Sequence, residues 1–598
     1  MCITRPTVTV ATLALLVAAR PARAVDCGYL PAPDQPRAVA NDNRAAGGTM
    51  REGVLTLRLA IREASWYPDG PIRCALRVRA FAEEGKAAQI PGPLIHVPAG
   101  TAVLVRVRNA LAVGVWVRGL QNRNTSVLDS TELAPGVTRE FRFRATTPGA
   151  WYYWAGAASA RVPASSVDGQ LVGALVVDSE ATASDRPSGA RVFVMTRWTP
   201  TGTPGISGFQ VNAINGRSWP HTERLTYTAG DSVRWHVINA SDELHMMHLH
   251  GFYFRVEARG DAAHDSALAR ARPVTVVSVA TRPGEWMTMV WSPERTGNWL
   301  FHCHFVAHMS ADQRLDRMPG ARAAATSSPH DHVANPSTVN HATESMAGLV
   351  LGITVRPAKI ARVDRTRRAT STLPSRMIDL FANTRPGVFG SRPALGFVTQ
   401  EGPHVPAAHS VRIPAAPLLL TRGESVRITV HNRLITPLGV HWHGIELESF
   451  FDGVGGWSGS GRRVAPMIAP GESFVARMTP PRAGTFMYHA HSELGDELAS
   501  GLYAPLLVLE PGQTFDPETD RVFVIATPGP GVGRGENAPA FINGTATPDT
   551  MVLVVGTRYR LRLIDISSNE AHVVSLSGPG GPATWRGLAR DGRDLLPE

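Results

Sequence analysis

Residues 102–109 read Ala102-Val-Leu-Val-Arg-Val-Arg-Asn109, residues 424–432 read Glu424-Ser-Val-Arg-Ile-Thr-Val-His-Asn432, and both stretches alternate apolar with polar side chains. Alternation with a period of two is typical of half-buried β-strands. The 598-residue chain has 56 glycines and 46 prolines, which favours short strands and turns over helix bundles. We therefore expect an all-β protein built from repeated Greek-key β-sandwich domains.

The chain contains an internal repeat with an offset of about 330 residues. Three pairs of segments match at this offset: residues 149–156 with 484–491, 115–120 with 440–445, and 240–251 with 567–578. This pattern indicates duplication of a two-domain unit. We predict domain A at 50–180, domain B at 181–357, a linker at 358–375, domain C at 376–511 and domain D at 512–598. Domain D ends before any counterpart of Phe301-His-Cys-His304, so it is either a partial domain or truncated.

The N-terminal residues have the pattern of a secretory signal peptide. Arg5 precedes an apolar run at 7–19, and Ala22-Arg-Ala24 provides a cleavage site. The run is too short to span a bilayer, and no other stretch is suited to a membrane helix. We expect cleavage after Ala24 and a secreted or periplasmic protein. In that oxidising compartment we first expect a Cys27–Cys74 disulfide, with two unrelated thiols as the alternative.

The formal net charge is +10 and comes almost entirely from arginine. These basic residues are scattered and form no long run, which disfavours a nucleic-acid-binding groove.

Four histidine clusters carry the chemistry of the chain. They are His245-x-x-His248-x-His250, His302-Cys303-His304-x-x-x-His308, His441-x-His443 and His489-x-His491. On a strand, residues i and i+2 share a face, so each His-x-His pair can direct two imidazoles to one place. Imidazole suits copper, zinc and iron. A single pair is a weak signal, whereas four pairs in one chain strongly predict a metal protein.

The His-Cys-His element points to copper. On a strand, Cys303 faces away from His302 and His304, so the thiolate serves one metal and the two histidines serve another. A thiolate with two histidines and a weak axial ligand forms a blue-copper electron-transfer site. A closed tetrahedral zinc site fits these spacings poorly.

With these four motifs, the whole mature chain resembles the multicopper oxidases, the family of laccases, bilirubin oxidases, metal oxidases and ceruloplasmin. The resemblance implies cupredoxin-like domains and four coppers, with four one-electron oxidations of a reductant coupled to reduction of O2 to water. It implies that His245, Cys303 and His308 bind the type 1 copper, and that His248 and His441 bind the type 2 copper. It also implies that the type 3 pair is held by His250, His302, His304, His443, His489 and His491.

The order of the motifs departs from the common three-domain pattern of that family, because the His-Cys-His domain B here precedes the His-x-His-Gly domain C. The trinuclear site should therefore lie between B and C, either within one chain or between two chains of a homo-oligomer. Domains A and D should be free of copper. Trp116, Arg118, Trp154 and Gly156 replace ligands in A, and Ser575 and Ser577 replace them in D, where His572 persists.

The axial ligand of the type 1 copper is ambiguous. Family spacing gives Gln313, but Met346-Ala-Gly-Leu349 resembles the segment that begins with the axial methionine, which implies an insertion after His308. His341 also lies five residues before Met346 and competes with His308. We favour His308 with Met346, and expect the loop residues His330 and His332 to be solvated.

Proton delivery to the oxygen site needs an acid. Asp452 matches the Asp-Gly element of the family beside the type 2 copper, although Asp-Gly is also a common turn pair. The other acid of the family is missing, because Phe305, Val306 and Ala307 occupy its place. Glu493, Asp496 or Glu497 are possible substitutes.

Two other function classes use similar ligands. A copper nitrite reductase contains cupredoxin domains but does not need all eight histidines of the type 2 and type 3 sites, and a copper-sequestering protein would need no turnover. The reductant, whether a phenol, an aryl amine or a metal ion, stays open. Met246 and Met247 lie beside His245, but they are as readily explained by packing.

Overall fold

The computed structural model describes residues 34–595, apart from 71–73, 123–128, 158–159, 165, 180–189, 201–207, 262–264, 268–273, 319–339, 359–375, 403, 408–409, 492–494, 528, 530–539, 549, 569 and 579–580. The predicted signal peptide, Cys27, His330, His332, Glu493 and most of the predicted linker lie outside these residues. Cys74 is disulfide-bonded and Cys303 is a free, buried thiol. Among the described residues, we find no helix with the length and apolar character needed to traverse a lipid bilayer.

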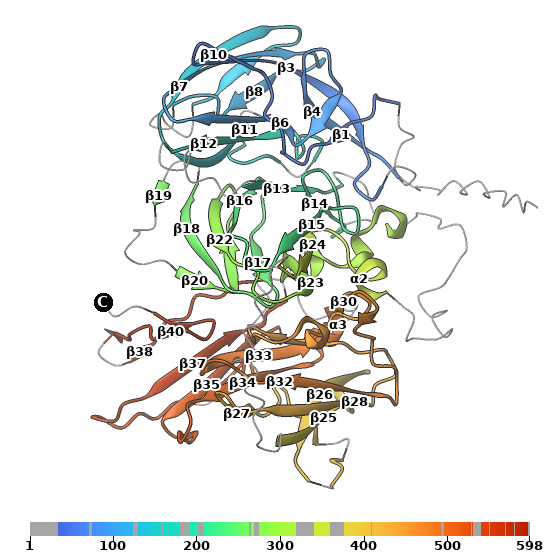
Figure 1. Ribbon diagram of the computed structural model, residues 1–598, viewed down its shortest axis with the longest axis vertical. Coiled ribbons are helices and arrows are strands. Elements are labelled where there is room, and N and C mark those ends of the chain that lie inside the picture. Colours follow the sequence, from blue (N-terminus) through green and yellow to red (C-terminus); the bar gives the residue numbers. More distant parts are fainter. Residues whose placement is uncertain are drawn as a thin grey trace, which may run out of the picture.

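The expectation of an all-β fold is confirmed, since strands stack in three successive blocks (Figure 1). The first block pairs two sheets. One has the order β1(Val39–Ala40), β5(Ala88–Ile90), β4(Leu76–Glu83), β3(Val54–Trp66), β7(Thr101–Asn109), β10(Thr138–Ala145), with β2(Thr49–Arg51) on β3. The other has the order β6(Gly92–Pro98), β12(Val172–Asp178), β11(Gly149–Gly156), β8(Val115–Arg118), β9(Thr131–Leu133). Their inward side chains share one apolar core, as alternation in β7 predicts.

The second block carries the His-Cys-His element. Its first sheet has the order β14(Val211–Ile214), β13(Arg191–Trp198), β16(Val233–Asn239), β22(Trp286–Trp291), β18(Phe254–Gly260), β19(Asp265–Ala267), with β20(Val274–Val276) on β18. Its second has the order β15(Arg224–Thr228), β24(Val350–Arg356), β23(Gly297–Cys303), β17(His245–Leu249), β21(Ser278–Thr281). Short helical turns follow β23: η1(Val306–His308), η2(Ala311–Gln313), η3(Leu315–Arg317) and α2(His341–Glu344).

The third block carries the other two histidine pairs. One sheet has the order β26(Arg392–Gln400), β25(Arg376–Phe389), β28(Val426–Asn432), β32(Ser473–Met478), and the other has the order β27(Leu418–Thr421), β34(Tyr503–Leu509), β33(Gly484–Ala490), β29(Val440–His443). The turns η7(Ser449–Phe451) and α3(Gly495–Ala499) complete it. Beside it lies a three-stranded sheet, β36(Phe541–Ile542), β35(Asp520–Ala526), β37(Arg560–Asp565), followed by the hairpins β38(Ser577–Gly578)–β39(Gly581–Pro582) and β40(Ala589–Arg590)–β41(Arg593–Asp594).

The sheets repeat the same topology at the positions of the sequence repeat. β12 pairs parallel with β6 and antiparallel with β11, and β34 does the same with β27 and β33. The strand order β36-β35-β37 repeats β14-β13-β16, with parallel pairing of the last two strands in both sheets. We propose that these sheets correspond to domains A to D with the bounds given above.

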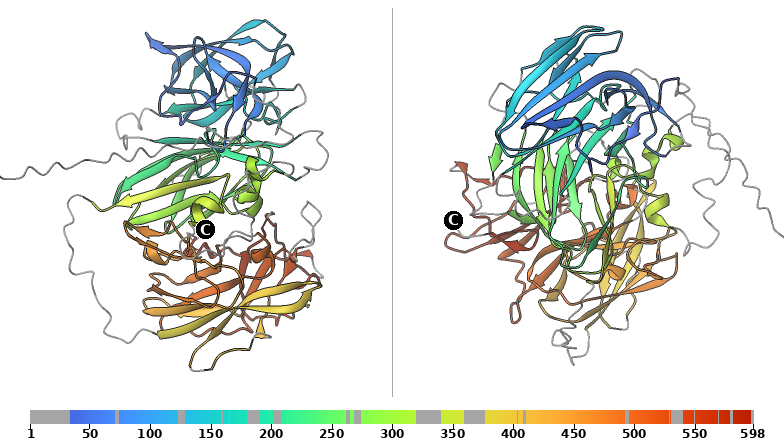
Figure 2. Two further views of the ribbon diagram at one scale, coloured as in Figure 1. Left: turned by 90° about the vertical axis from the view of Figure 1, so that its right-hand side faces the viewer. Right: turned by 45° about the horizontal axis from the view of Figure 1, so that its top comes forward.

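The second and third blocks are joined by direct contacts. A hairpin of the third block, β30(Gly459–Ser460)–β31(Arg463–Val464), extends the sheet of the second, where Gly459 pairs with Asn298 of β23. Trp457 Nε1 donates to Trp299 O, and Ser449 Oγ donates to Asn298 O. The stacking of the blocks is also visible from the side (Figure 2). This junction places β17 and β23 opposite β29 and β33.

Candidate metal centres

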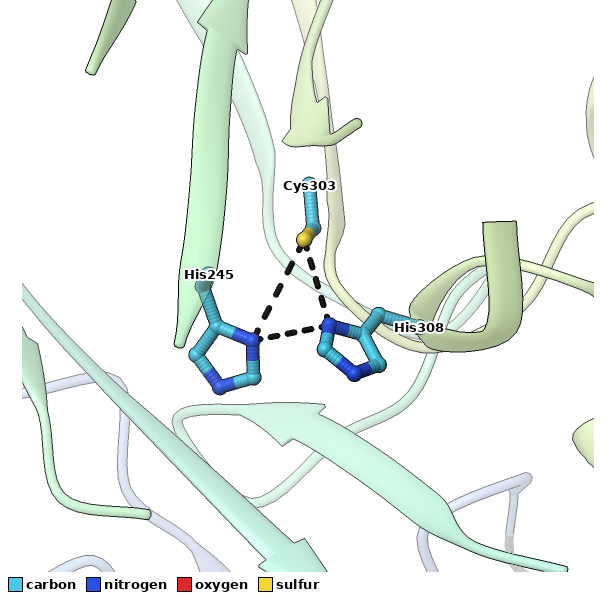
Figure 3. Close-up of side chains that lie close together, drawn as sticks. All are labelled: His245, Cys303 and His308. Atoms are coloured by element: carbon cyan, nitrogen blue, oxygen red, sulfur yellow. Dashed lines mark hydrogen bonds between the residues drawn. The ribbon is translucent and has the colours of Figure 1, made fainter. Parts of the chain in front are cut away.

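The first centre is a buried triangle of one sulfur and two nitrogens (Figure 3). Cys303 Sγ, at the end of β23, lies 3.3 Å from His308 Nδ1 and 4.0 Å from His245 Nδ1, and these two nitrogens are 3.0 Å apart. His245 begins β17, and the turn η1 returns His308 towards the sulfur. The group therefore has the thiolate and bis-imidazole donor set of a blue-copper site.

The outer nitrogens of both imidazoles are held by polar neighbours. Ser241 Oγ lies 2.9 Å from His245 Nε2 and donates its own proton to Asn239 Oδ1, so it accepts from the imidazole. His308 Nε2 donates to Glu243 Oε2 at 2.7 Å. Both contacts favour tautomers that leave Nδ1 available to a metal, as partners of metal-bound histidines do.

The two histidines of this triangle have opposite pKa shifts. Burial lowers the pKa of His245 well below its ordinary value. Burial also acts to lower the pKa of His308, but Cys303 and the Glu243 carboxylate together outweigh it and raise the pKa to about 9. Without a metal, His308 therefore holds a proton that a cation at the sulfur must displace.

The second centre gathers eight histidines from four strand ends, all at most 9% exposed. Their ligand atoms form three groups of three, each group within 4.8 Å: His248, His250 and His441; His250, His302 and His491; His304, His443 and His489. The first two groups share His250, and the third group shares no residue with them. Strand pairing explains the convergence, because His248 lies opposite His302 in one sheet and His441 lies opposite His489 in the other.

Backbone carbonyls orient several of these rings. His302 Nδ1 donates to Cys303 O at 2.8 Å, His489 Nδ1 to Ala490 O at 2.9 Å, and His441 Nδ1 to Asp452 O at 2.9 Å. The Nε2 atoms are thereby directed inwards, where those of His250 and His302 lie 2.8 Å apart and those of His304 and His489 lie 3.3 Å apart. The His443 ring has the opposite orientation, because its Nε2 lies 3.1 Å from Ser278 Oγ.

The charge state of the cluster suits a metal. Burial lowers the pKa of His302 to about 4 and that of His489 to about 3. Burial also lowers the pKa of His248, His250, His304, His443 and His491 well below the ordinary value. At neutral pH these rings are uncharged and offer lone pairs, which metal ligation requires. Among the described residues, His443 Nδ1 and both nitrogens of His491 are buried without a hydrogen-bond partner, so the donor set fits copper ions.

Asp452 lies at this cluster, at the C-terminal end of η7, and is fully buried. Its Oδ2 accepts from His250 Nδ1 at 2.8 Å and from Ser458 Oγ at 3.3 Å, while Oδ1 lies 3.4 Å from His441 Nδ1. Of the substitutes considered, Glu497 is buried and accepts from Thr436 Oγ1 at 2.8 Å. The side chains of Glu493 and Asp496 lie outside the described residues.

The structure places the two rival histidines in different centres. His308 lies in the Cys303 triangle, whereas the His341 ring, on α2, lies 5.7 Å from that of His491 in the histidine cluster. Met346 is buried and forms a β-bridge with Ser310, in the segment that follows His308. Gln313 Oε1 accepts from Gln210 N at 2.8 Å.

In domains A and D, other residues stand where domains B and C carry the candidate histidine ligands. The buried Arg118 guanidinium lies 4.6 Å from the ring centroid of Trp154, a cation–π contact between paired strands. In D, Ser575 and Ser577 are exposed, and His572 Nδ1 lies 3.1 Å from Asp565 Oδ2.

Our sequence reasoning missed Ser241, Glu243, Ser278 and Ser458, which hold the candidate ligands from outside. Ser241 and Glu243 are four and two residues before His245, so their proximity in sequence was a usable signal. Ser278 is remote in sequence from His248 and His443, whose rings it contacts, and no local pattern identifies it. Ser458 follows Asp452 by only six residues, so its place near that carboxylate was also a usable signal.

Comparisons with known proteins show similarity to multicopper oxidases. Two family models, each described as multicopper oxidase, match residues 187–315 and residues 85–182 and 408–513. The multicopper oxidase MmcO of Mycobacterium tuberculosis is 31% identical over 148 residues, which are 23% of this chain and 27% of that protein. A copper resistance protein A homolog of Pseudomonas syringae pv. tomato is 40% identical over 96 residues, 16% of this chain and 15% of that protein.

A solved structure, the blue copper oxidase from Nitrosomonas europaea, aligns at 20% identity over 50% of this chain and 85% of that chain, with a TM-score of 0.37. The chain spans less than a third of the length of the two curated relatives named above. The family-model matches nevertheless cover the ranges that contain both candidate centres and together more than half of the residues. The chain belongs to the multicopper oxidase family.

Proposed function

We propose that the protein is an oxidase that couples four one-electron oxidations of a reducing substrate to the four-electron reduction of O2 to water. It would use four coppers. His245, Cys303, His308 and Met346 would hold the type 1 copper, and His248 and His441 would hold the type 2 copper. The type 3 pair would be held by His250, His302, His304, His443, His489 and His491.

One observation carries the proposal. Eight buried histidines from domains B and C form three three-ligand groups, beside a separate thiolate and bis-imidazole group. A copper-storage protein does not need both a thiolate centre and a histidine cluster, connected through the consecutive residues His302, Cys303 and His304. A nitrite reductase does not need all eight histidines, so the complete set favours O2 as the acceptor.

The residues of the chain define the route between the centres. Bound copper would supply reversible one-electron chemistry and O2 reduction. Cys303 is bonded through the main chain to His302 and His304, so an electron that reaches its sulfur has a short covalent path to the histidine cluster. Asp452, held against His250 and His441, is the buried carboxylate placed to exchange protons there.

The outer edge of the Cys303 centre is where a reductant would dock. Glu243, whose side chain is 35% exposed, contacts His308, and Arg197 pairs with both Glu243 and Asp242 at 2.8 Å and 3.0 Å. The edge therefore carries mixed charge. We propose a small-molecule or metal-ion reductant without choosing among a phenol, an aryl amine and a metal ion.

Domains A and D are proposed to be structural and copper-free, with the trinuclear centre at the B–C junction. We also propose that the protein is exported to the periplasm or secreted, with cleavage after Ala24. No nucleic-acid or membrane partner is proposed, and the oligomeric state stays open.

The test is to load the protein with copper and to follow O2 and nitrite consumption in parallel with a phenolic dye as reductant. We expect O2 consumption, four coppers per functional unit and an intense visible thiolate–copper band. Cys303→Ser should abolish the band and turnover while the other copper is retained. A Cys303→Ser variant that stays blue, or a wild type that consumes only nitrite, would overturn the proposal.

A further inference from the structure

A β-hairpin from the C-terminal part of the described chain inserts its tip between domains B and C. In this hairpin β40 pairs with β41 around the two-residue turn Asp591–Gly592, whose φ angles are +50° and +69°. Positive φ at both positions is the signature of a type I′ turn, for which Asp-Gly is a favoured pair. The tip is therefore a defined, locally encoded structure.

The hairpin tip contacts both domains. On the domain B side, Tyr253 Oη donates to Asp591 O at 2.6 Å, and the Arg593 guanidinium lies 5.3 Å from the Tyr253 ring centroid. On the domain C side, the backbone at Gly592 is so close to Phe486 that a Cβ there would meet the ring at 2.3 Å. A Cβ on Gly484 would lie 2.7 Å from Gly592 Cα. Glycine is thus needed on both sides of this contact.

The Asp591 carboxylate binds a particular peptide of domain B. Its Oδ2 accepts from Val277 N at 2.9 Å and from Ser278 N at 3.0 Å. Burial raises the pKa of Asp591, and the two amide donors oppose that shift. A carboxylate that accepts two backbone N–H groups fixes their position strongly, because such bonds are charge-assisted.

That same peptide orients two rings of the histidine cluster. His248 Nδ1 donates to Val277 O at 2.9 Å and lies 3.1 Å from Ser278 Oγ. Ser278 Oγ is also 3.1 Å from His443 Nε2. His248 and His443 stack with their centroids 3.8 Å apart, so a shift of Ser278 would turn both rings.

We propose that Asp591 is a positioning residue for the trinuclear centre, acting through Val277 and Ser278 on His248 and His443. This inference rests on the proposed function. It gives this hairpin a role in the centre between B and C, although domain D is proposed to be copper-free. Loss of such a supporting partner typically costs 10- to 100-fold in metal affinity or activity.

The experiment compares Asp591→Ala with Asp594→Ala, an exposed carboxylate on the same hairpin, in copper-loaded full-length protein. The readouts are copper retained per chain during dialysis against a chelator, the electron paramagnetic resonance spectrum of the type 2 copper, and the visible thiolate–copper band. We expect Asp591→Ala to weaken type 2 copper retention about 10- to 100-fold and to alter its spectrum, with an unchanged visible band. Asp594→Ala should match the wild type.

Two further variants keep the test decisive. Asp591→Asn retains an acceptor oxygen and should recover most of the type 2 spectrum. Ser278→Ala removes the hydroxyl but leaves the hairpin contacts, and should reproduce the spectral change even where Asp591→Ala fails to fold. Wild-type copper retention and spectrum in both Asp591→Ala and Ser278→Ala would overturn the inference. If the wild type itself binds no copper beyond the thiolate site, the proposed function fails instead.

Discussion

Cys303 and its two flanking histidines link the two candidate centres at the level of single residues. Cys303 ends β23 with its sulfur in the apolar core of domain B, while His302 and His304 join the histidine cluster. The period of two along a strand is enough to separate the thiol from its neighbours. His308 lies beside the Cys303 sulfur. Asp452 lies beside His250 in the histidine cluster.

The first prediction separates His308 from His341. Because His308 Nδ1 lies 3.3 Å from the sulfur, His308→Ala should remove the visible thiolate–copper band. His341→Ala should keep that band, since its ring contacts His491 in the other centre. Visible spectra of both copper-loaded variants check this. Loss of colour in His341→Ala with retention in His308→Ala would reverse the assignment.

The second prediction concerns Asp452. Asp452→Asn keeps an oxygen for His250 but cannot exchange a proton. Substrate reduction of the type 1 copper should survive, whereas reoxidation by O2 should slow by roughly 100-fold, the scale of a general acid–base contribution. Stopped-flow reoxidation measures this, with Glu497→Gln as the comparison for the alternative acid. An unaltered rate in Asp452→Asn would leave Asp452 as a turn residue only.

At the level of structural elements, domains A, B and C share a strand end with the same hydrogen bond, and domains A and C share a strand pair. Asn109, Asn239 and Asn432 each end a strand, and in each case Oδ1 accepts from the amide two residues later. The same topology then places the pair β11–β8 in domain A where β33–β29 lies in domain C. Domain A thus retains the strand framework and carries Trp154 and Arg118 where domain C carries histidines.

The third prediction tests the turn that follows η7. Gly453 has a φ of +93°, and a Cβ there would lie 1.9 Å from Val440 O, next to β29 and His441. Gly453→Ala should therefore displace β29, lower the unfolding free energy by about 1–3 kcal/mol and reduce type 2 copper retention. Gly461→Ala is the matched control, because its φ is also positive (+57°) but no atom lies within 4 Å of a Cβ. Equal effects of the two substitutions in urea unfolding would refute the clash argument.

At the scale of the whole molecule, the histidine cluster links stability of the metal-free protein to pH. The cluster histidines with lowered pKa values, such as His302 at about 4 and His489 at about 3, stay neutral when folded but bind protons near pH 6.5 when unfolded. The unfolded state therefore binds more protons below pH 6.5, and acid favours unfolding. His308, with its pKa raised to about 9, acts oppositely, because its stabilisation is complete below pH 6.5 and is lost towards pH 9.

The fourth prediction follows from this balance. The urea midpoint of the metal-free protein should be highest near pH 6.5–7 and fall steeply towards pH 5. Each neutral buried histidine contributes up to about 1.4 kcal/mol per pH unit below 6.5. Copper should raise the midpoint, since it binds only the folded cluster. A midpoint that is constant between pH 7 and pH 5 would contradict the burial of neutral histidines.

The sequence by itself determined the features that depend on local order along the chain. Alternation in residues 102–109 predicted a strand, which the structure confirms, and the His-x-His and His-Cys-His spacings predicted copper chemistry, because strand geometry follows from a period of two. Two of the repeated segment pairs form equivalent strands, β8 with β29 and β11 with β33, whereas residues 571–576 form no strand where domain B has β17.

Only the tertiary structure decided which distant groups meet. His341 lies beside His491 rather than Cys303, and Asp591 reaches Val277 from 314 residues away. Such contacts depend on how whole sheets pack and on where a hairpin docks, and no local pattern encodes them. For that physical reason, the ligand types were readable from the sequence, but remote residues that hold the ligands in place, such as Ser278 and Asp591, were not.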